Sequence, residues 1–174
     1  MLVKVDNYKD EAVCICPNGT QGDVIELGGL LIVLPTAPPE KEIAGYGRSA
    51  DLQMWERVPM PKELSRIGSM DEWSEMPREF RQKFSAYIEE EFRRRREGFW
   101  FYNNGEPTYI TGRHYMMLQW TKIDIGYPSY LSFQRDIFIH MAACEIDDRC
   151  LGQLYTKCRR SGNTNICSAV LLDE

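Results

Sequence analysis

The sequence predicts a mixed α/β fold, in which a strand-rich N-terminal segment is followed by a domain of helices and strands. Short β-prone runs joined by turn residues occupy the first 34 residues. Apolar residues recur at helical spacing over residues 77–97, and the last 21 residues have the pattern of a strand, a loop and a helix. Because 43% of the 174 residues are hydrophobic, we expect a packed core.

Composition limits the classes of function. The net charge of −5 lacks the overall basic footprint of a dedicated nucleic-acid-binding domain, so any DNA contact must be local or lie outside this chain. The six cysteines form no CxxC pair and no Cys/His cluster with metal-ligand spacing, and we interpret them as free thiols. No signal peptide is visible, and the longest apolar run, residues 27–35, is far shorter than the roughly 20 residues that span a bilayer. We therefore expect a soluble cytoplasmic protein that is neither secreted nor bound to a membrane.

The N-terminal segment is predicted to form a hairpin. The runs EAVCIC (11–16) and VIELGGLLIVLP (24–35) are β-prone, and PNGTQGD between them supplies turn residues. Residues 35–61 are irregular and rich in proline and glycine, which is typical of a linker. The predicted organisation is therefore a strand-rich segment with a linker at 1–61 and a separate domain at 62–174.

The clearest helix is predicted at residues 77–97. Pro77 suits the first turn, Gly98 suits the end, and one face carries an apolar stripe. Glutamates are expected to pair with arginines four residues further along the helix. These residues are Glu89, Glu90, Glu91, Arg93, Arg94 and Arg95. We interpret this charge run as a solvated face; the alternative is a contact with DNA or another subunit.

The remaining elements alternate. Strands are predicted at 99–103 and 107–110, helices at 111–120 and 129–146, and a short strand at 152–157 before a final helix. Five aromatic residues of this region are expected to fill the core rather than to stack on bases, namely Trp100, Tyr102, Tyr109, Tyr115 and Trp120. His114 is expected to pack beside Tyr115 and to bond to backbone rather than to catalyse, and His140 is expected to be structural.

The junction between the last strand and the last helix has the pattern of a phosphate-binding loop. Such loops have the form G-x-x-x-x-G-K-[ST], and their backbone amides and helix dipole bind phosphates. Gly162 and Thr164 match the second glycine and the hydroxyl, whereas Lys157 stands at the first glycine and Asn163 at the lysine. Any strand-to-helix turn that contains a glycine would often match this well, so the pattern alone is weak evidence.

Two further features favour a nucleotide site. Lys157, Arg159 and Arg160 supply cations that could neutralise phosphates in place of the missing lysine. Upstream, the amide of Gln134 can donate and accept side by side, as the N6 and N7 edge of adenine requires. We interpret Gln134 as a candidate adenine contact; the alternative is an ordinary surface glutamine.

Three blocks of the sequence resemble the large terminase subunits of tailed bacteriophages, in particular those of crAss-like phages. The blocks are GFWFYNNGEPTYITGRHYMMLQWTKID (98–124), GYPSYLSFQRDIF (126–138) and GQLYTKCRRSGNT (152–164). The aromatic and glycine pattern of the first block is the most specific. Large terminases join a P-loop ATPase to an RNase H-like nuclease. The resemblance therefore implies the start of an ASCE-type P-loop NTPase domain after the strand-rich segment.

The resemblance also implies site residues and partners. Gln134 would contact adenine, and Thr164 would ligate the Mg²⁺ that accompanies ATP. The phosphates would be contacted by Lys157, Arg159, Arg160, Ser161, Gly162, Asn163 and Thr164. In this family a cation nearer the start of the loop often replaces the usual lysine, which implies Lys157, with Arg160 as its closest helper. The implied partners are viral DNA, the portal protein, the small terminase subunit and further copies in a ring, in the host cytoplasm.

The 174 residues lack recognisable Walker B and nuclease motifs of this family. AVLLDE (169–174) imitates a Walker B strand but follows the loop too closely, so Asp173 and Glu174 are predicted to belong to the final helix. We expect the full-length protein to hydrolyse ATP, package DNA into procapsids and cut it, and the chain as given to be inactive alone. The alternatives are another P-loop helicase or translocase, and a non-catalytic module that binds an anion or nucleotide.

Overall fold

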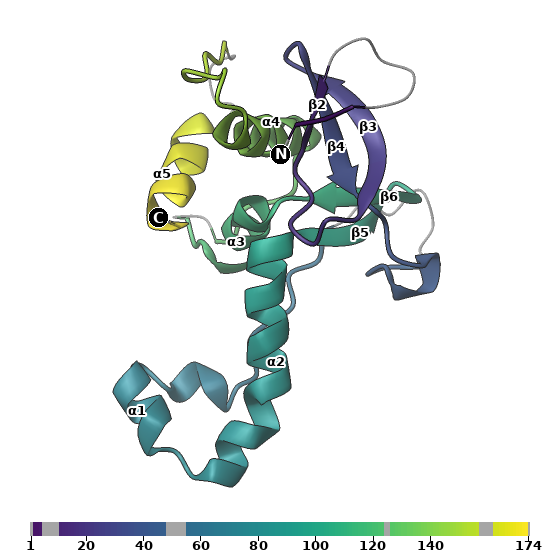
Figure 1. Cartoon of the computed structure of the whole chain (residues 1–174). Helices are drawn as coiled ribbons and strands as arrows, with labels where there is room; N and C mark the ends of the chain where they lie inside the picture. The colour runs from purple at the N-terminus through teal and green to yellow at the C-terminus, as the bar shows by residue number, and fades with distance from the viewer. Residues whose placement is uncertain (1, 5–10, 48–54, 124–125, 157–161, 174) are drawn as a thin grey trace.

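The computed structural model describes residues 2–4, 11–47, 55–123, 126–156 and 162–173 (Figure 1). Within them the fold is mixed α/β, as predicted, with two small sheets and five α-helices. The strands are β1 (Leu2–Lys4), β2 (Glu11–Cys14), β3 (Gln21–Leu27), β4 (Leu30–Pro35), β5 (Phe99–Asn103) and β6 (Glu106–Ile110). The helices are α1 (Met70–Glu75), α2 (Arg78–Glu97), α3 (Gly112–Trp120), α4 (Ser132–Ile146) and α5 (Asn163–Asp173), with 3-10 turns η1 (Glu40–Glu42) and η2 (Leu64–Arg66). Among these helices, none combines the length and apolar character needed to cross a membrane.

The N-terminal sheet has the strand order β1-β2-β4-β3. β4 pairs with β3 in antiparallel fashion and with β2 in parallel, and Val13 lies opposite Ile32. The predicted hairpin between the first two β-prone runs is therefore wrong, because the second run folds back on itself at Gly28 and Gly29. Both glycines have positive φ, 57° and 81°, as a two-residue type I′ turn requires.

The second sheet is the hairpin of β5 and β6, in which Phe99 lies opposite Ile110. Its turn residues Asn104 and Gly105 have φ values of 53° and 80°, again suited to a type I′ turn. This confirms the strands predicted at 99–103 and 107–110, although β6 begins one residue earlier than expected.

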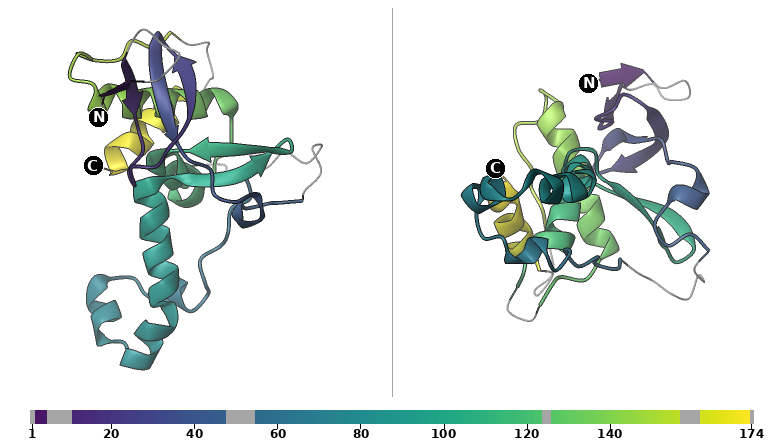
Figure 2. Two further views of the ribbon diagram at one scale, coloured as in Figure 1. Left: turned by 45° about the vertical axis from the view of Figure 1, so that its right-hand side comes forward. Right: turned by 90° about the horizontal axis from the view of Figure 1, so that it is seen from below.

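Helix α2 confirms the helix predicted at 77–97, with Pro77 as its N-cap. It ends at Gly98, whose φ of 83° favours glycine and whose position leaves no room for a side chain. Figures 1 and 2 show α2 projecting from the body of the protein with α1 at its far end. There, the rings of Trp73 and Phe80 meet with centroids 6.3 Å apart. Phe80, at the outer end of the apolar stripe, therefore packs against α1.

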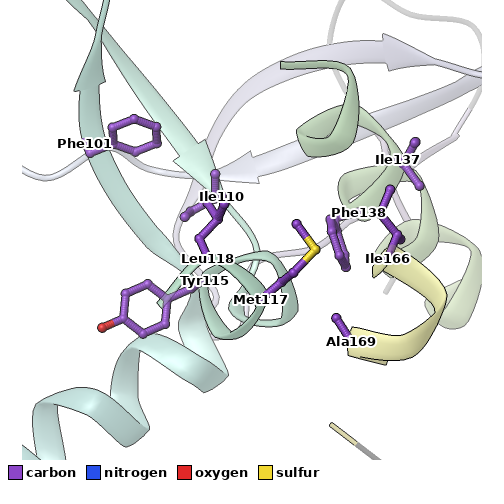
Figure 3. Packing of buried hydrophobic residues seen from close by; sticks show 9 residues of the cluster. All are labelled: Phe101, Ile110, Tyr115, Met117, Leu118, Ile137, Phe138, Ile166 and Ala169. Atoms are coloured by element: carbon purple, nitrogen blue, oxygen red, sulfur yellow. The ribbon is translucent and has the colours of Figure 1, made fainter. Parts of the chain in front are cut away.

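One core cluster lies among α3, α4, α5 and the second sheet (Figure 3). It consists of Phe101, Ile110, Tyr115, Met117, Leu118, Ile137, Phe138, Ile166 and Ala169. A second cluster joins the N-terminal sheet to β6 and α4. It consists of Val13, Ile15, Ile32, Leu34, Tyr109, Ile139 and Ala143. The N-terminal sheet thus shares a core with later elements, and the domain boundary near residue 62 stays a prediction.

The C-terminal helices confirm three sequence predictions. α3 and α5 cover the expected residues, α4 begins at Ser132 rather than 129, and Asp173 is helical. Glu174 lies outside the described residues. The strand predicted at 152–157 is wrong over residues 152–156, which form no regular structure.

Candidate functional site

The candidate site lies at the start of α5. Gly162 immediately precedes the helix with a φ of 72°, and its carbonyl oxygen accepts hydrogen bonds from the amides of Asn165 and Ile166 at 3.0 and 3.2 Å. The first amides of a helix have no acceptor within it, and the helix dipole makes this end positive. Gly162 has no side chain to cover them. The start of α5 therefore suits an anion.

Gln134 reaches this helix start from α4. It lies in the first turn of α4 and is 5% exposed. Its Nε2 is 3.1 Å from the position that a Cβ on Gly162 would occupy. Ile166 and Ala169 of α5 pack beside Phe138 of α4 (Figure 3), and this packing holds the two helices together. The structure thus brings together two residues that the sequence analysis selected for different reasons.

The amide of Gln134 is not fully satisfied. Its Oε1 is buried and has no hydrogen-bond partner among the described residues. A buried polar atom without a partner costs on the order of 1–3 kcal/mol, so a ligand that donates to this oxygen would recover stability. The N6 amine of adenine is such a donor.

Other parts of the predicted loop are described only partly. Thr164 is exposed on the first turn of α5, where its hydroxyl is accessible to a metal ion. Asn163 is the first residue of α5, but the structure does not describe its side chain. Lys157, Arg159, Arg160 and Ser161 lie outside the described residues. Which cation replaces the usual lysine therefore stays a prediction.

The segment before the loop departs from a phosphate-binding loop. Residues 151–156 are not part of a strand, and Leu151 and Leu154 are almost completely exposed. A strand needs a neighbour that accepts and donates its backbone hydrogen bonds. Neither described sheet includes a strand beside this segment, so the strand that should lead into the loop does not form there.

A cluster of sulfur and nitrogen atoms, which was not predicted from the sequence, lies beside this segment. His140 Nδ1 lies 2.8 Å from Gln153 Nε2 and 3.5 Å from Cys144 Sγ, and Cys150 Sγ is 3.3 Å from Cys144 Sγ. Burial raises the pKa of Cys144 to about 11, so the thiol is protonated at neutral pH. The spacing of four residues between His140 and Cys144 was the available signal. Within the described ranges, no group of three or more His, Cys, Asp or Glu residues is arranged to hold a metal ion.

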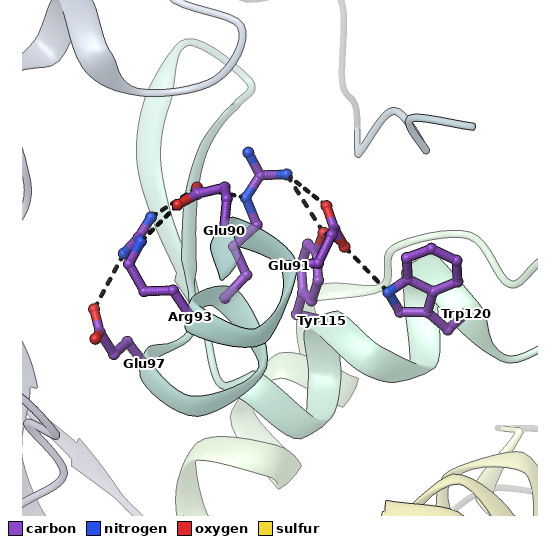
Figure 4. Close-up of polar contacts among 7 residues, drawn as sticks. Glu90, Glu91, Arg93, Glu97, Tyr115 and Trp120 are labelled. Atoms are coloured by element: carbon purple, nitrogen blue, oxygen red, sulfur yellow. Dashed lines mark hydrogen bonds and ion pairs between the residues drawn. The ribbon is translucent and has the colours of Figure 1, made fainter. Parts of the chain in front are cut away.

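The charge run on α2 is partly buried rather than wholly solvated. Figure 4 shows its hydrogen bonds and ion pairs. Glu91 is only 8% exposed, and its Oε2 accepts hydrogen bonds from Tyr115 Oη at 2.6 Å and Trp120 Nε1 at 3.2 Å. Its Oε1 accepts a bond from Arg94 at 3.2 Å. Arg94 also pairs with Glu90 at the predicted spacing of four residues. The interpretation as a solvated face is therefore wrong for Glu91, which ties α2 to α3.

His114 packs in the core, as predicted. Its ring is fully buried and stacks on Phe138 and Tyr130, with centroids 4.8 and 5.8 Å away. Among the described residues, none hydrogen-bonds to either ring nitrogen, so the predicted bond from this ring to backbone is wrong there. Burial and the nearby charge of Arg135 lower the pKa of His114 to about 3. The folded protein therefore holds this imidazole neutral.

We expect His114 to make the protein less stable in mild acid. Between pH 6.5 and about 3 the unfolded chain protonates this histidine and the folded protein does not, so stability falls as the pH falls through that window. At pH 5 the loss would be on the order of 2 kcal/mol relative to pH 7. Urea unfolding at the two pH values measures it. His114→Phe should remove most of the difference, and an unchanged difference in that variant would contradict the assignment to His114.

Comparison of the chain with protein-family models, curated proteins and solved structures finds no match.

Proposed function

We propose that the chain is the amino-terminal part of the ATPase motor of a phage large terminase, and that it binds ATP at the start of α5. The observation that carries this proposal is the position of Gln134. Its amide lies against Gly162 with an unpartnered, buried oxygen. We propose that this pair provides the adenine contact of a nucleotide site of the P-loop ATPase type.

The proposed roles follow from the position of each residue. The first amides of α5 would bind phosphate oxygens, with charge supplied by Lys157, Arg159 or Arg160. The exposed hydroxyl of Thr164 would hold Mg²⁺, which offsets the charge of the phosphates. In the full-length protein, the motor would form a ring, contact the portal protein and the small terminase subunit, and move viral DNA.

One observation favours a second function. Residues 152–156 form no strand, and a P-loop is the turn between a strand and a helix. Without that strand, the start of α5 would serve as a non-catalytic site for an anion or a nucleotide. Another P-loop helicase or translocase would use the same residues as a terminase and differs only in its partners.

The adenine contact can be tested by nucleotide binding. We expect Gln134→Ala to weaken the binding of Mg²⁺-ATP about tenfold, because a bidentate amide contact to adenine contributes about 1–3 kcal/mol. GTP binding should change little, since guanine presents two acceptors at the same edge. Titration calorimetry on the full chain measures both. Gln82→Ala, at an exposed position of α2, serves as the matched control.

Three outcomes separate the possibilities. Equal losses of ATP and GTP affinity in Gln134→Ala would contradict the adenine contact. Binding of ATP that is independent of Mg²⁺ would favour the non-catalytic module. ATP turnover by the full-length protein that is stimulated by DNA, and is abolished by Lys157→Ala and Arg160→Ala but less affected by Asn163→Ala, would support the motor.

A further inference from the structure

A cavity of about 470 Å³ lies where the N-terminal sheet meets the helices. The loop that follows β2, the end of α2, the start of α3 and one side of α4 enclose it. Figure 1 shows these elements converging at the inner end of α2. None of the residues that line the cavity belongs to the site formed by Gln134 and Gly162, so the two sites are distinct.

Arginines outnumber acidic residues in the described lining of the cavity, although the chain is acidic. Arg95 and Arg96 reach it from the last turn of α2, and Arg113 from the first turn of α3. Among the described residues that line it, Glu145 of α4 is the only acidic one, and it pairs with Arg113. The described lining thus contains three guanidinium groups and one carboxylate, in a protein whose net charge is −5. We call this cavity the arginine cavity.

The geometry of α3 adds donors to these charges. Thr111 caps the helix through its hydroxyl, which accepts a hydrogen bond from the amide of His114 at 3.4 Å. Gly112 and Arg113 line the cavity and are the first two residues of α3. Their backbone amides therefore have no hydrogen-bond acceptor within the helix. Guanidinium groups bind phosphate through two parallel hydrogen bonds, and the positive end of a helix favours an anion.

The cavity also has an apolar part. Ile15, which directly follows β2, and Phe138 and Met141 from α4 contribute hydrocarbon and aromatic surface. Arg96 is exposed and forms no ion pair with any described residue, so its guanidinium can turn toward a ligand. A ligand that combines a phosphate group with an uncharged remainder matches both parts of the lining.

We propose that the arginine cavity binds a phosphate ester, with the phosphate held by Arg96 and Arg113. Two sources offer this chemistry, a small organic phosphate and the backbone of a nucleic acid. The first would enter the cavity completely. The second would place one phosphate at its mouth and leave the bases outside.

Binding to the full chain tests the proposal with three probes. They are inorganic phosphate, ribose 5-phosphate, which has no adenine for Gln134 to contact, and a short fluorescent DNA duplex. Arg96→Gln should weaken the binding of the preferred probe about tenfold, since a hydrogen bond to a charged group contributes about 1.5–3 kcal/mol. For the duplex, the slope of log affinity against log salt should fall by about one. Arg78→Gln, exposed in the first turn of the same helix, should bind as the wild type does.

Glu145→Gln gives the sharpest outcome, because it removes the carboxylate that competes for Arg113 and should strengthen binding several-fold. Preference for ribose 5-phosphate over the duplex would assign the cavity to a small ligand, and the reverse preference to a nucleic acid. Absence of binding by all three probes, or equal losses in Arg96→Gln and Arg78→Gln, would overturn the proposal. Weaker binding by Glu145→Gln would do the same.

Discussion

Replacing Gly112 with alanine is expected to lower the free energy of unfolding by about 3 kcal/mol or more. A Cβ at this position would lie 1.8 Å from the carbonyl oxygen of Arg95 and 2.5 Å from its carbonyl carbon. Both atoms belong to the backbone of α2, so no side-chain rotation relieves the clash. The crossing of α2 and α3 would have to open. Urea unfolding followed by circular dichroism measures the loss.

Gly68→Ala is the matched control for this substitution. A Cβ on Gly68 would meet only the carboxylate of Glu72, at 3.7 and 3.9 Å, which is ordinary contact distance. We expect this variant to change stability by less than about 0.5 kcal/mol. If Gly112→Ala were as stable as Gly68→Ala, the close approach of α2 and α3 would be wrong.

Glu91→Ala is expected to cost about 3 kcal/mol of stability. The carboxylate accepts hydrogen bonds from Tyr115, Trp120 and Arg94, and its removal leaves buried donors without an acceptor. Burial and the hydrogen bond to Glu91 raise the pKa of Tyr115, so the phenol stays protonated and keeps a hydroxyl donor that needs an acceptor. Thermal unfolding and the near-ultraviolet signal of Trp120 report the change.

The control for Glu91→Ala is Glu89→Ala, which removes an exposed carboxylate from the same helix. Loss of a surface charge typically changes stability by less than about 0.5 kcal/mol. Glu91→Gln tests the hydrogen bonds separately from the charge, because the amide oxygen can still accept from one donor. Equal stabilities of the Glu89 and Glu91 alanine variants would show that the network contributes nothing.

Elements set by neighbouring residues were predictable from the sequence. Pro77 and Gly98 delimit α2, and Asn104 with Gly105 fixes the hairpin of β5 and β6. These signals act within a few residues, through backbone conformations that few residue types favour. For the candidate site, the position of Gly162 directly before α5 was predictable for the same reason.

Features that depend on distant partners were not predictable. β2 pairs in parallel with β4, so β3 lies at the edge of the sheet and not beside β2, where a simple hairpin would place it. Residues 152–156 have a β-prone sequence but no strand beside them. The sequence pattern predicts a solvated Glu91, because helical periodicity gives no information about Tyr115 and Trp120, which bind its carboxylate from α3. The contact of Gln134 with Gly162 likewise depends on how α4 and α5 pack.

The projection of α2 has a mechanical consequence. Its 20 residues form a rod about 30 Å long, so a rotation of about 10° at its crossing with α3 would move α1 by about 5 Å. In the opposite direction, a load applied at α1 acts as a torque on α3. Met117 of α3 packs in the same cluster as Ile166 of α5. A single helix, α3, therefore connects this lever arm to α5, the helix that follows Gly162.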